Sequence, residues 1–163
     1  MKQIQLTQGR YTTVDDCDYE YLLGFSWHYH AYSRKGGYAS YTTPHDSSGK
    51  QYTVKMHHLI ADRMGVTRDE KKVDHADGNQ LNNCRYNLRL ATQSQNLANR
   101  GLDKNNTSGY KGVCFQDGRW RAAVRSKGKR YHLGYFDSKL EAAKAYNKAA
   151  LEVFGDFARL NVL

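Results

Sequence analysis

The 163-residue sequence lacks any long hydrophobic run, and this absence excludes one class of protein. No apolar segment approaches the ~18 residues that a helix needs to cross a bilayer, and the mean hydropathy is -0.84. Residues 1–6 do not begin an apolar stretch that ends at a small-residue cleavage site. We therefore expect neither a membrane span nor a signal peptide, and we expect an intracellular protein.

The sequence also has few cysteines. Cys17, Cys84 and Cys114 are odd in number and widely spaced, and they contain no C-x-x-C pair. They support neither a disulfide framework nor a cysteine-based zinc site. The adjacent His57 and His58 also lack partners at the spacing of a structural zinc site, so we expect no structural zinc.

Acidic residues are scarce relative to basic ones. The chain has 25 Lys and Arg against 16 Asp and Glu, a formal net charge of +9. Residues 1–100 carry 13 basic and 10 acidic side chains, whereas residues 101–163 carry 12 and 6. The segment from Lys104 to Arg130 contains eight basic residues and one acidic residue, Asp117. This distribution predicts a polyanionic partner, and nucleic acid is the first candidate.

Residues 1–55 are rich in residues that favour strands, and no internal repeat interrupts the chain. The runs 10–14, 38–43 and 51–55 are separated by turn residues at 35–37 and 47–49, which predicts short antiparallel strands. The segment holds eight of the 13 tyrosines. Packing in a core is the explanation we favour for them, and a stacking platform for nucleic acid is the alternative.

The next segment, residues 56–100, changes to a mixed pattern. We expect a helix over 57–64, a strand over 73–75, a strand over 88–91 and a helix from 92 to about 101. The spacing of Thr92 and Gln95 is that of a capping box, which fixes the start of the last helix. Residues 101–109 are rich in Asn, Gly and Ser and read as a linker.

The last segment, residues 110–163, predicts a three-stranded antiparallel sheet followed by one helix that begins at Ser138. The strands are expected over 110–115, 119–125 and 130–136. Alternation along the strands gives the sheet one apolar and one basic face. The apolar face is expected to carry Trp120, Ala122, Val124, Tyr131, Leu133 and Tyr135, and the basic face Arg119, Arg121, Arg125, Arg130 and His132.

A dense group of polar residues lies across the predicted β-β-α unit, from Asp74 to Asn96. A histidine beside a carboxylate, with an amide on the following helix, offers oxygen ligands to a hard cation and a base to a water molecule. This set suits phosphodiester hydrolysis. Consecutive strand residues point to opposite faces, so Asp74 and His75 can serve one centre only if the strand ends there. An Asx-rich surface loop without chemistry is the alternative.

The ordered motifs of this region are Met56-His57-His58-Leu59-Ile60, Asp74-His75-x-Asp77-Gly78-Asn79, Asn82-Asn83, Asn87-Leu88-Arg89 and Asn96. Together they resemble the HNH (His-Me finger, ββα-metal) endonucleases of phages and introns. The resemblance implies that His75 is the general base, that Asp74 and Asn96 bind a metal, and that Asn87 orients His75. Asn96 replaces the final His of the family name and is a neutral, weaker ligand.

Further implications of the same resemblance concern ions, products and neighbours of the site. It implies one divalent ion, Mg²⁺ or Mn²⁺, and products with a 5′-phosphate. His57 would contact phosphate or pack against the site, and His58, where the family tends to carry Arg, would face DNA. The phage type implies action in the cytoplasm of a bacterial host.

A second set of motifs lies in residues 109–161: Ser108-Gly109-Tyr110-Lys111-Gly112-Val113, Arg119-Trp120-Arg121-Ala122, Leu133-Gly134-Tyr135-Phe136, Glu141-Ala142-Ala143-x-Ala145-Tyr146 and Leu160-Asn161. It resembles the ethylene-response-factor (Apetala-type) DNA-binding domain of plants, in which the sheet enters the major groove. Three strands about 4.8 Å apart span roughly 10 Å, which fits a groove about 12 Å wide.

Specific residues of the basic face can be assigned to DNA. Arginine reads guanine edges with two hydrogen bonds, and lysine suits phosphates. The expected groove residues are Arg119, Arg121, Arg125 and Arg130, the expected phosphate contacts are Lys111, Lys127 and Lys129, and His132 stands where the family usually carries a DNA-facing Trp. A solvated basic face is the alternative explanation.

We therefore predict an α+β protein with a β-rich N-terminal segment leading into a ββα-metal nuclease core and a C-terminal sheet packed on one helix. The expected domains are 1–100, with the nuclease core at 56–100, a linker at 101–109, and a DNA-binding domain at 110–163. The predicted function is metal-dependent cleavage of double-stranded DNA by a monomer or a homodimer. The alternative is a DNA-binding regulator whose ββα unit is a relic.

Overall fold

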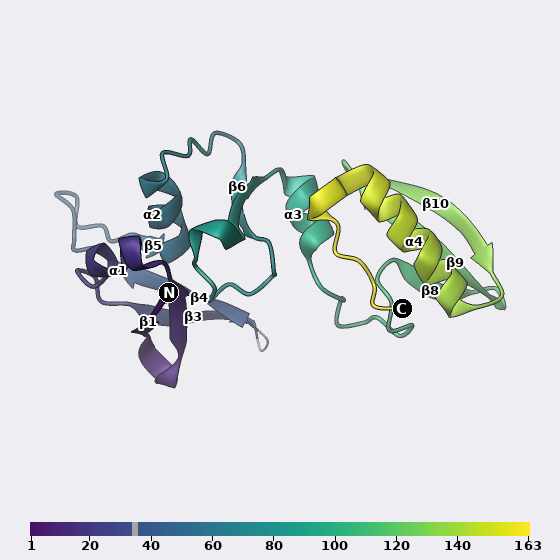
Figure 1. The fold of residues 1–163 in the computed structure, drawn as a ribbon, viewed down its shortest axis with the longest axis horizontal. Helices are drawn as coiled ribbons and strands as arrows, with labels where there is room; N and C mark the ends of the chain where they lie inside the picture. The colour runs from purple at the N-terminus through teal and green to yellow at the C-terminus, as the bar shows by residue number, and fades with distance from the viewer. Residues whose placement is uncertain (34–35) are drawn as a thin grey trace. The chain divides into compact units, whose positions relative to one another are not determined.

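A computed structural model describes residues 1–33 and 36–163 and shows a mixed α+β protein with four α-helices and several small sheets in this part of the chain (Figure 1). The chain divides into two compact units, Met1–Leu90 and Ala91–Leu163. No helix among the described residues is long and apolar enough to cross a membrane.

The first unit contains three sheets and two α-helices among the described residues. Its strands pair in the orders β1-β2, β3-β4-β5 and β6-β7. The elements are β1 (Lys2–Gln5), η1 (Thr7–Gly9), β2 (Tyr11–Val14), α1 (Asp16–Leu22), β3 (His28–Ser33), β4 (Gly36–Thr42), β5 (Thr53–Lys55), α2 (Met56–Arg63), β6 (Lys72–His75), η2 (Arg85–Asn87) and β7 (Leu88–Ala91). One apolar core joins the strands to the helices through Val14, Leu22, Met56 and Ile60, all fully buried.

The three strands expected in residues 1–55 are present, but the expectation of strands alone was wrong. Helix α1 was not predicted, because its tyrosines suggested strand. Asp16 and Asp18 lie in its first turn, where acidic residues stabilise a helix N-terminus. Asp18 is buried, and ion pairs with two arginines compensate its charge. The expected turn at 35–37 includes Lys35, which lies outside the described residues, while Gly36 and Gly37 open β4.

The tyrosines of this segment have two different environments. Tyr19, Tyr29 and Tyr41 pack against the apolar core. Tyr32 and Tyr52 are instead more than half exposed. Core packing, the favoured explanation, therefore accounts for only some of them.

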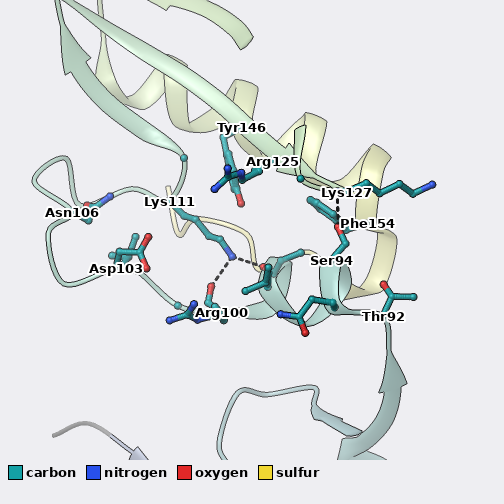
Figure 2. Close-up of a pocket in the computed structure, with 17 residues that line it drawn as sticks. Thr92, Ser94, Arg100, Asp103, Asn106, Lys111, Arg125, Lys127, Tyr146 and Phe154 are labelled. Carbon is teal, nitrogen blue, oxygen red and sulfur yellow. Dashed lines mark hydrogen bonds between the residues drawn. The ribbon is translucent and has the colours of Figure 1, made fainter. Parts of the chain in front are cut away.

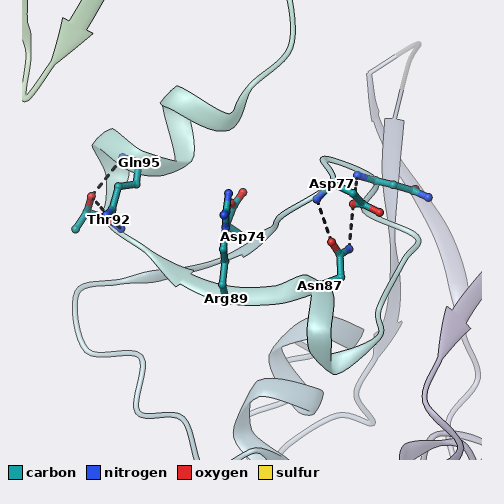
Figure 3. A network of polar contacts seen from close by, with 7 residues as sticks. Asp74, Asp77, Asn87, Arg89, Thr92 and Gln95 are labelled. Carbon is teal, nitrogen blue, oxygen red and sulfur yellow. Dashed lines mark hydrogen bonds and ion pairs between the residues drawn. The ribbon is translucent and has the colours of Figure 1, made fainter. Parts of the chain in front are cut away.

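The expected β-β-α order follows as β6, β7 and α3 (Gln93–Asn99). The predicted capping box is confirmed: Thr92 Oγ1 accepts from Gln95 N at 3.3 Å, and Gln95 Oε1 accepts from Thr92 N at 2.9 Å (Figure 3). By its contacts, α3 belongs to the second unit.

The second unit is built on the predicted three-stranded antiparallel sheet, with order β10-β9-β8. Its elements are α3, β8 (Val113–Gln116), β9 (Arg119–Ser126), β10 (Lys129–Phe136), α4 (Lys139–Phe154) and η3 (Gly155–Phe157). Helix α4 lies along the sheet (Figure 1). Its Ala142, Ala143 and Ala150 are fully buried, and these short side chains allow the close approach.

A β-bulge changes the predicted faces of β10. The register shifts between His132 and Gly134, where Gly134 has a φ of +130° that favours glycine. Beyond the bulge Tyr135 pairs with Arg121, so its side chain joins the basic face instead of the apolar one. The rings of Tyr135 and His132 lie 4.9 Å apart.

Candidate functional site

The polar stretch of the first unit begins where β6 ends, at His75. Gly78, with a φ of +76°, turns the chain, and its N–H donates to His75 O at 2.9 Å. Asp77 Oδ1 accepts from Asn79 N at 2.7 Å, which is an Asx turn. The strand therefore ends at the position that the chemistry requires.

His75 is buried and lies in a cluster of aromatic side chains. Its ring meets the ring of His57 edge-on with centroids 4.9 Å apart, and His57 meets His58 at 4.6 Å. On its other side, His57 lies 5.4 Å from the ring of Tyr38. His57 thus packs against the site, one of its two expected roles.

Burial keeps these histidines neutral. It lowers the pKa of His57 to about 2 and of His58 to about 4, with help from the nearby positive charges of Lys55 and Arg68. Burial also lowers the pKa of His75, although the hydrogen bond from its ring to Asn83 Oδ1 opposes the shift. A neutral imidazole is the form that can accept a proton.

Asp74 is buried and forms an ion pair with β7. Its Oδ2 lies 3.1 Å from Nε of Arg89, and the two side chains lie together in Figure 3. Arg89 was part of the quoted motif but had no role in the sequence analysis. The pair fixes the Asp74 carboxylate on the strand next to His75.

The side chain of Asn87 holds the loop that follows His75. Its Oδ1 accepts from Asp77 N at 3.0 Å, and its Nδ2 donates to Asp77 Oδ1 at 3.0 Å and Asn82 O at 2.8 Å (Figure 3). Asn83 Oδ1 lies at hydrogen-bond distance from His75, 3.2 Å from its Nε2. Asn83 is therefore placed to orient the ring, the role expected for Asn87, while the hydrogen bonds of Asn87 shape the turn.

The two expected metal ligands belong to different units: Asp74 lies on β6 and Asn96 on α3. In the part of the chain that the structure describes, no three His, Cys, Asp or Glu side chains are grouped as a metal cluster. A carboxylate oxygen and an amide oxygen are each ligands that a hard divalent cation accepts. The chemistry of each residue therefore fits a divalent ion.

The basic face of the second unit carries most of the residues assigned to DNA. Exposed side chains on it are Arg119, Arg125, Arg130 and His132, and Lys127 and Lys129 are exposed at the end of the sheet where β9 turns into β10. Arg119 pairs with Asp137 at 3.0 Å, a surface contact that costs little to break. Arg121 is half-buried, and its Nε has no partner among the described residues.

Lys111 has partners that differ from the expected phosphate. Its ammonium donates to Ala98 O and, at 2.6 Å, to Arg100 O at the C-terminal end of α3 (Figure 2). Burial lowers the pKa of Lys111 to about 8. A cavity of about 750 Å³ opens beside it, between α3, the segment 100–106, the turn after β9, and α4. Lys111 is therefore a structural anchor within the second unit.

Sequence reasoning missed the roles of Asn83, Thr12 and Tyr135. Asn83 stood in a quoted motif, so its presence was visible but its partner was not. Thr12 of β2 belongs to no sequence motif: its Oγ1 accepts a hydrogen bond from Nδ2 of Asn83, 71 positions further along the chain. Tyr135 was assigned to the wrong face because alternation does not reveal a bulge.

Comparisons with known proteins address the first resemblance. A sequence model of the HNH endonuclease family matches residues 54–98. The chain is 39% identical over 89 residues to protein 3.8 of Escherichia phage T7, which covers 53% of this chain and 73% of the phage protein. The chain belongs to the HNH endonuclease family. It is also 34% identical over 126 residues to an uncharacterized HNH endonuclease of Acanthamoeba polyphaga mimivirus, which covers 77% of this chain.

The HNH chain spans 64% of the length of the mimivirus relative. It also matches plant proteins: it is 40% identical over 68 residues to rice dehydration-responsive element-binding protein 2A, covering 40% of this chain and 25% of the plant protein. Over 60 residues it is 38% identical to APETALA2-like protein 2 of rice, which covers 36% of this chain and 14% of that protein. The Apetala-type resemblance is therefore confirmed beside the HNH one.

Proposed function

We propose that this HNH protein is a metal-dependent endonuclease of the phage or homing type that hydrolyses phosphodiester bonds in double-stranded DNA. One observation carries the proposal: β6 ends at a buried neutral imidazole, His75, directly after a buried carboxylate, Asp74. The phage and viral relatives support the type.

In the proposed reaction, His75 accepts a proton from a water molecule whose oxygen attacks the phosphorus atom. The bond between phosphorus and the 3′ oxygen breaks, which leaves a 5′-phosphate and a 3′ oxyanion, and that oxyanion takes a proton from solvent to become the 3′-hydroxyl. The pKa of His75 is lowered by burial, so the imidazole is ready to accept a proton at neutral pH. His57 packs against the ring and restricts its movement.

We propose Asp74 as the residue of the first unit that would hold the divalent ion, and the family resemblance assigns Asn96 of α3 as a further ligand. When bound, such an ion supplies positive charge that stabilises the developing charge on the phosphate and the leaving oxygen. Arg89 holds the Asp74 carboxylate through its Nε at 3.1 Å. Removing Arg89 should therefore weaken ion binding by releasing that carboxylate.

The basic face of the β8–β10 sheet is the proposed DNA-binding surface. One of the rice relatives is named a dehydration-responsive element-binding protein. The exposed cations of the sheet have the chemistry to bind phosphates and guanine edges. We assign Arg119, Arg121, Arg125, Arg130, His132, Lys127 and Lys129 to this surface, and we remove Lys111 from it. Tyr135 joins the surface beside His132.

The test of catalysis is nicking of supercoiled plasmid with Mg²⁺ or Mn²⁺, with and without EDTA. The wild type should convert supercoiled to open-circular plasmid when the metal is present without EDTA, and not when EDTA chelates it. The His75→Ala variant should lose activity by about 100-fold or more, since it lacks the general base. Equal activity in the two proteins would contradict the role of His75.

His45→Ala is the matched control, because it also removes a histidine of the first unit, but an exposed one in the loop between β4 and β5. This variant should keep most of the activity and the same requirement for metal. If neither the wild type nor the variants nick DNA while all bind it, the regulator with a relic nuclease unit is the better description.

A further inference from the structure

The ring of His75 is the end of a buried chain of hydrogen bonds that starts on β2. Thr12 is completely buried, and Asn83 is 1% exposed. Asn83 Nδ2 lies 2.8 Å from Thr12 Oγ1, and Asn83 Oδ1 lies 3.2 Å from His75 Nε2. The amide of Asn83 therefore stands between the hydroxyl and the imidazole.

The direction of each hydrogen bond follows from the chemistry of Thr12. A hydroxyl has one proton to donate. Its two acceptors are Leu81 O at 2.8 Å and the thioether of Met56 at 3.9 Å, and the carbonyl is the nearer and stronger. With the proton given to Leu81, the oxygen of Thr12 accepts from Asn83. Only the NH₂ of an amide can donate, so Nδ2 must face Thr12.

This orientation decides which atom of Asn83 faces the histidine. The carbonyl Oδ1 remains on the side of His75, and a carbonyl oxygen can only accept. His75 Nε2 must then carry the proton of the neutral ring. Nδ1 is the unprotonated nitrogen, the atom that can take a proton.

We propose that Thr12 and Asn83 are positioning residues that hold His75 in the Nε2–H tautomer and so make Nδ1 the basic atom. The proposal rests on the proposed function for its kinetic consequence, but the tautomer itself does not depend on it. It also gives the N-terminal segment a part in the site that its sequence did not suggest.

Backbone contacts keep β2 in place for this role. Thr13 N donates to Leu81 O at 2.9 Å, and Asn83 N donates to Thr13 O at 2.8 Å. The loop that contains Asn83 is thus bonded to β2 on both sides of Asn82. The position of Thr12 relative to Asn83 is fixed by main chain as well as by side chain.

The first test is spectroscopic and uses the full chain labelled with ¹⁵N, at pH 8, without DNA or metal. Long-range ¹H–¹⁵N correlations distinguish a protonated Nε2 from a protonated Nδ1 in a neutral imidazole. We expect His75 to show a protonated Nε2 and an unprotonated Nδ1. A protonated Nδ1 as the main form would overturn the proposal, whether or not the protein cleaves DNA.

The second test compares Thr12→Val with Thr12→Ser. Valine keeps the shape of threonine but lets the Asn83 amide turn over, so we expect a mixed tautomer signal and a kcat for nicking lower by roughly tenfold with KM unchanged. Serine retains the hydroxyl and should restore both the signal and kcat.

Thr7→Val is the control for loss of a threonine hydroxyl in the same unit. Thr7 Oγ1 accepts from Tyr29 N at 2.9 Å, away from the chain that leads to His75. This variant should leave the His75 signal and kcat unchanged. If Thr12→Val lowers the melting temperature but leaves both the tautomer and kcat as in the wild type, its role is structural only and the proposal fails.

Discussion

At the scale of single residues, Asp18 determines how the first unit packs. Its carboxylate is fully buried and accepts from Arg85 Nε and Nη2, each at 2.7 Å, and from Arg63 Nε at 2.9 Å. These bonds connect α1 to α2 and to η2, the turn that precedes β7. One carboxylate thus joins the unpredicted helix to the loop that shapes the site.

We predict that Asp18→Asn lowers the free energy of unfolding by about 2 to 3 kcal/mol at pH 7. Removing one partner of a buried ion pair usually costs 3–5 kcal/mol, but both arginines here are about one-third exposed and solvent reduces the loss. Urea unfolding followed by circular dichroism measures it. Asp16→Asn is the control, since the Asp16 carboxylate is exposed; a similar loss in both variants would contradict the prediction.

The same residue predicts a pH dependence. The hydrogen bonds from Arg85, and then those from Arg63, lower the pKa of Asp18 below 3.8 in the folded protein. The unfolded chain therefore binds the proton more tightly, and the stabilisation is complete above pH 3.8. It should be lost as the pH falls through the folded pKa. In Asp18→Asn, the acid-induced fall in melting temperature should be smaller than in the wild type.

At the scale of elements, α3 was expected within the nuclease core of residues 56–100, and its contacts lie in the second unit. It has seven residues, too few to be stable alone, and of these only Ala98 enters the apolar core of the second unit. Hydrogen bonds also attach it to the unit: from Lys111 to Ala98 O, from Arg159 N to Ala98 O at 3.3 Å, and from Lys127 N to Ser94 Oγ at 3.1 Å. Polar anchors, beside a cavity, therefore hold the helix that carries Asn96.

We predict that Lys111→Met increases hydrogen exchange in residues 93–100 by about tenfold. The variant removes two charge-assisted hydrogen bonds to the last carbonyls of α3, where a cation also favours the helix dipole. Mass spectrometry of peptide fragments measures the exchange. Lys129→Met, at the exposed first residue of β10, is the control and should leave α3 unchanged. Equal exchange in the wild type and Lys111→Met would show that packing alone holds the helix.

At the scale of the whole molecule, charge and buried chemistry are divided between the two units. The histidine cluster and Asp74 belong to the first unit, and the basic sheet belongs to the second. Seven of the eight cations between Lys104 and Arg130 remain for DNA once Lys111 is removed. Electrostatic attraction therefore belongs mainly to the second unit.

We predict a log–log slope of binding constant against salt of about −6 or shallower for duplex DNA, from seven cations at most and about 0.9 counterions released per contact. Lys129→Gln should make the slope shallower by about 1, because it removes one phosphate contact. Lys111→Gln should leave the slope unchanged, since its ammonium is bonded to carbonyl oxygens. Fluorescence anisotropy measures both slopes in proteins that also carry His75→Ala, which should bind DNA without cleaving it. Equal changes in slope for the two lysine variants would show that Lys111 contacts DNA.

Patterns among neighbouring residues of the sequence predicted much of the fold correctly. The capping box at Thr92, the end of β6 at His75 and the three strands of the second unit follow from side-chain chemistry within a few residues. Such features depend on neighbours along the chain, so periodicity and turn residues are sufficient to predict them. The motifs that carry His75 and Asp74 were visible for the same reason.

The sequence by itself determined the charge of the chain, the order of its elements and the residue types of the site. Only the tertiary structure decided that Asn83 and Thr12 contact His75, that Arg89 pairs with Asp74, and that a bulge turns Tyr135 to the basic face. It also decided that Lys111 anchors α3. Each of these depends on hydrogen bonds between segments far apart in the chain, or on a one-residue shift of register, and neither leaves a periodic pattern in the sequence.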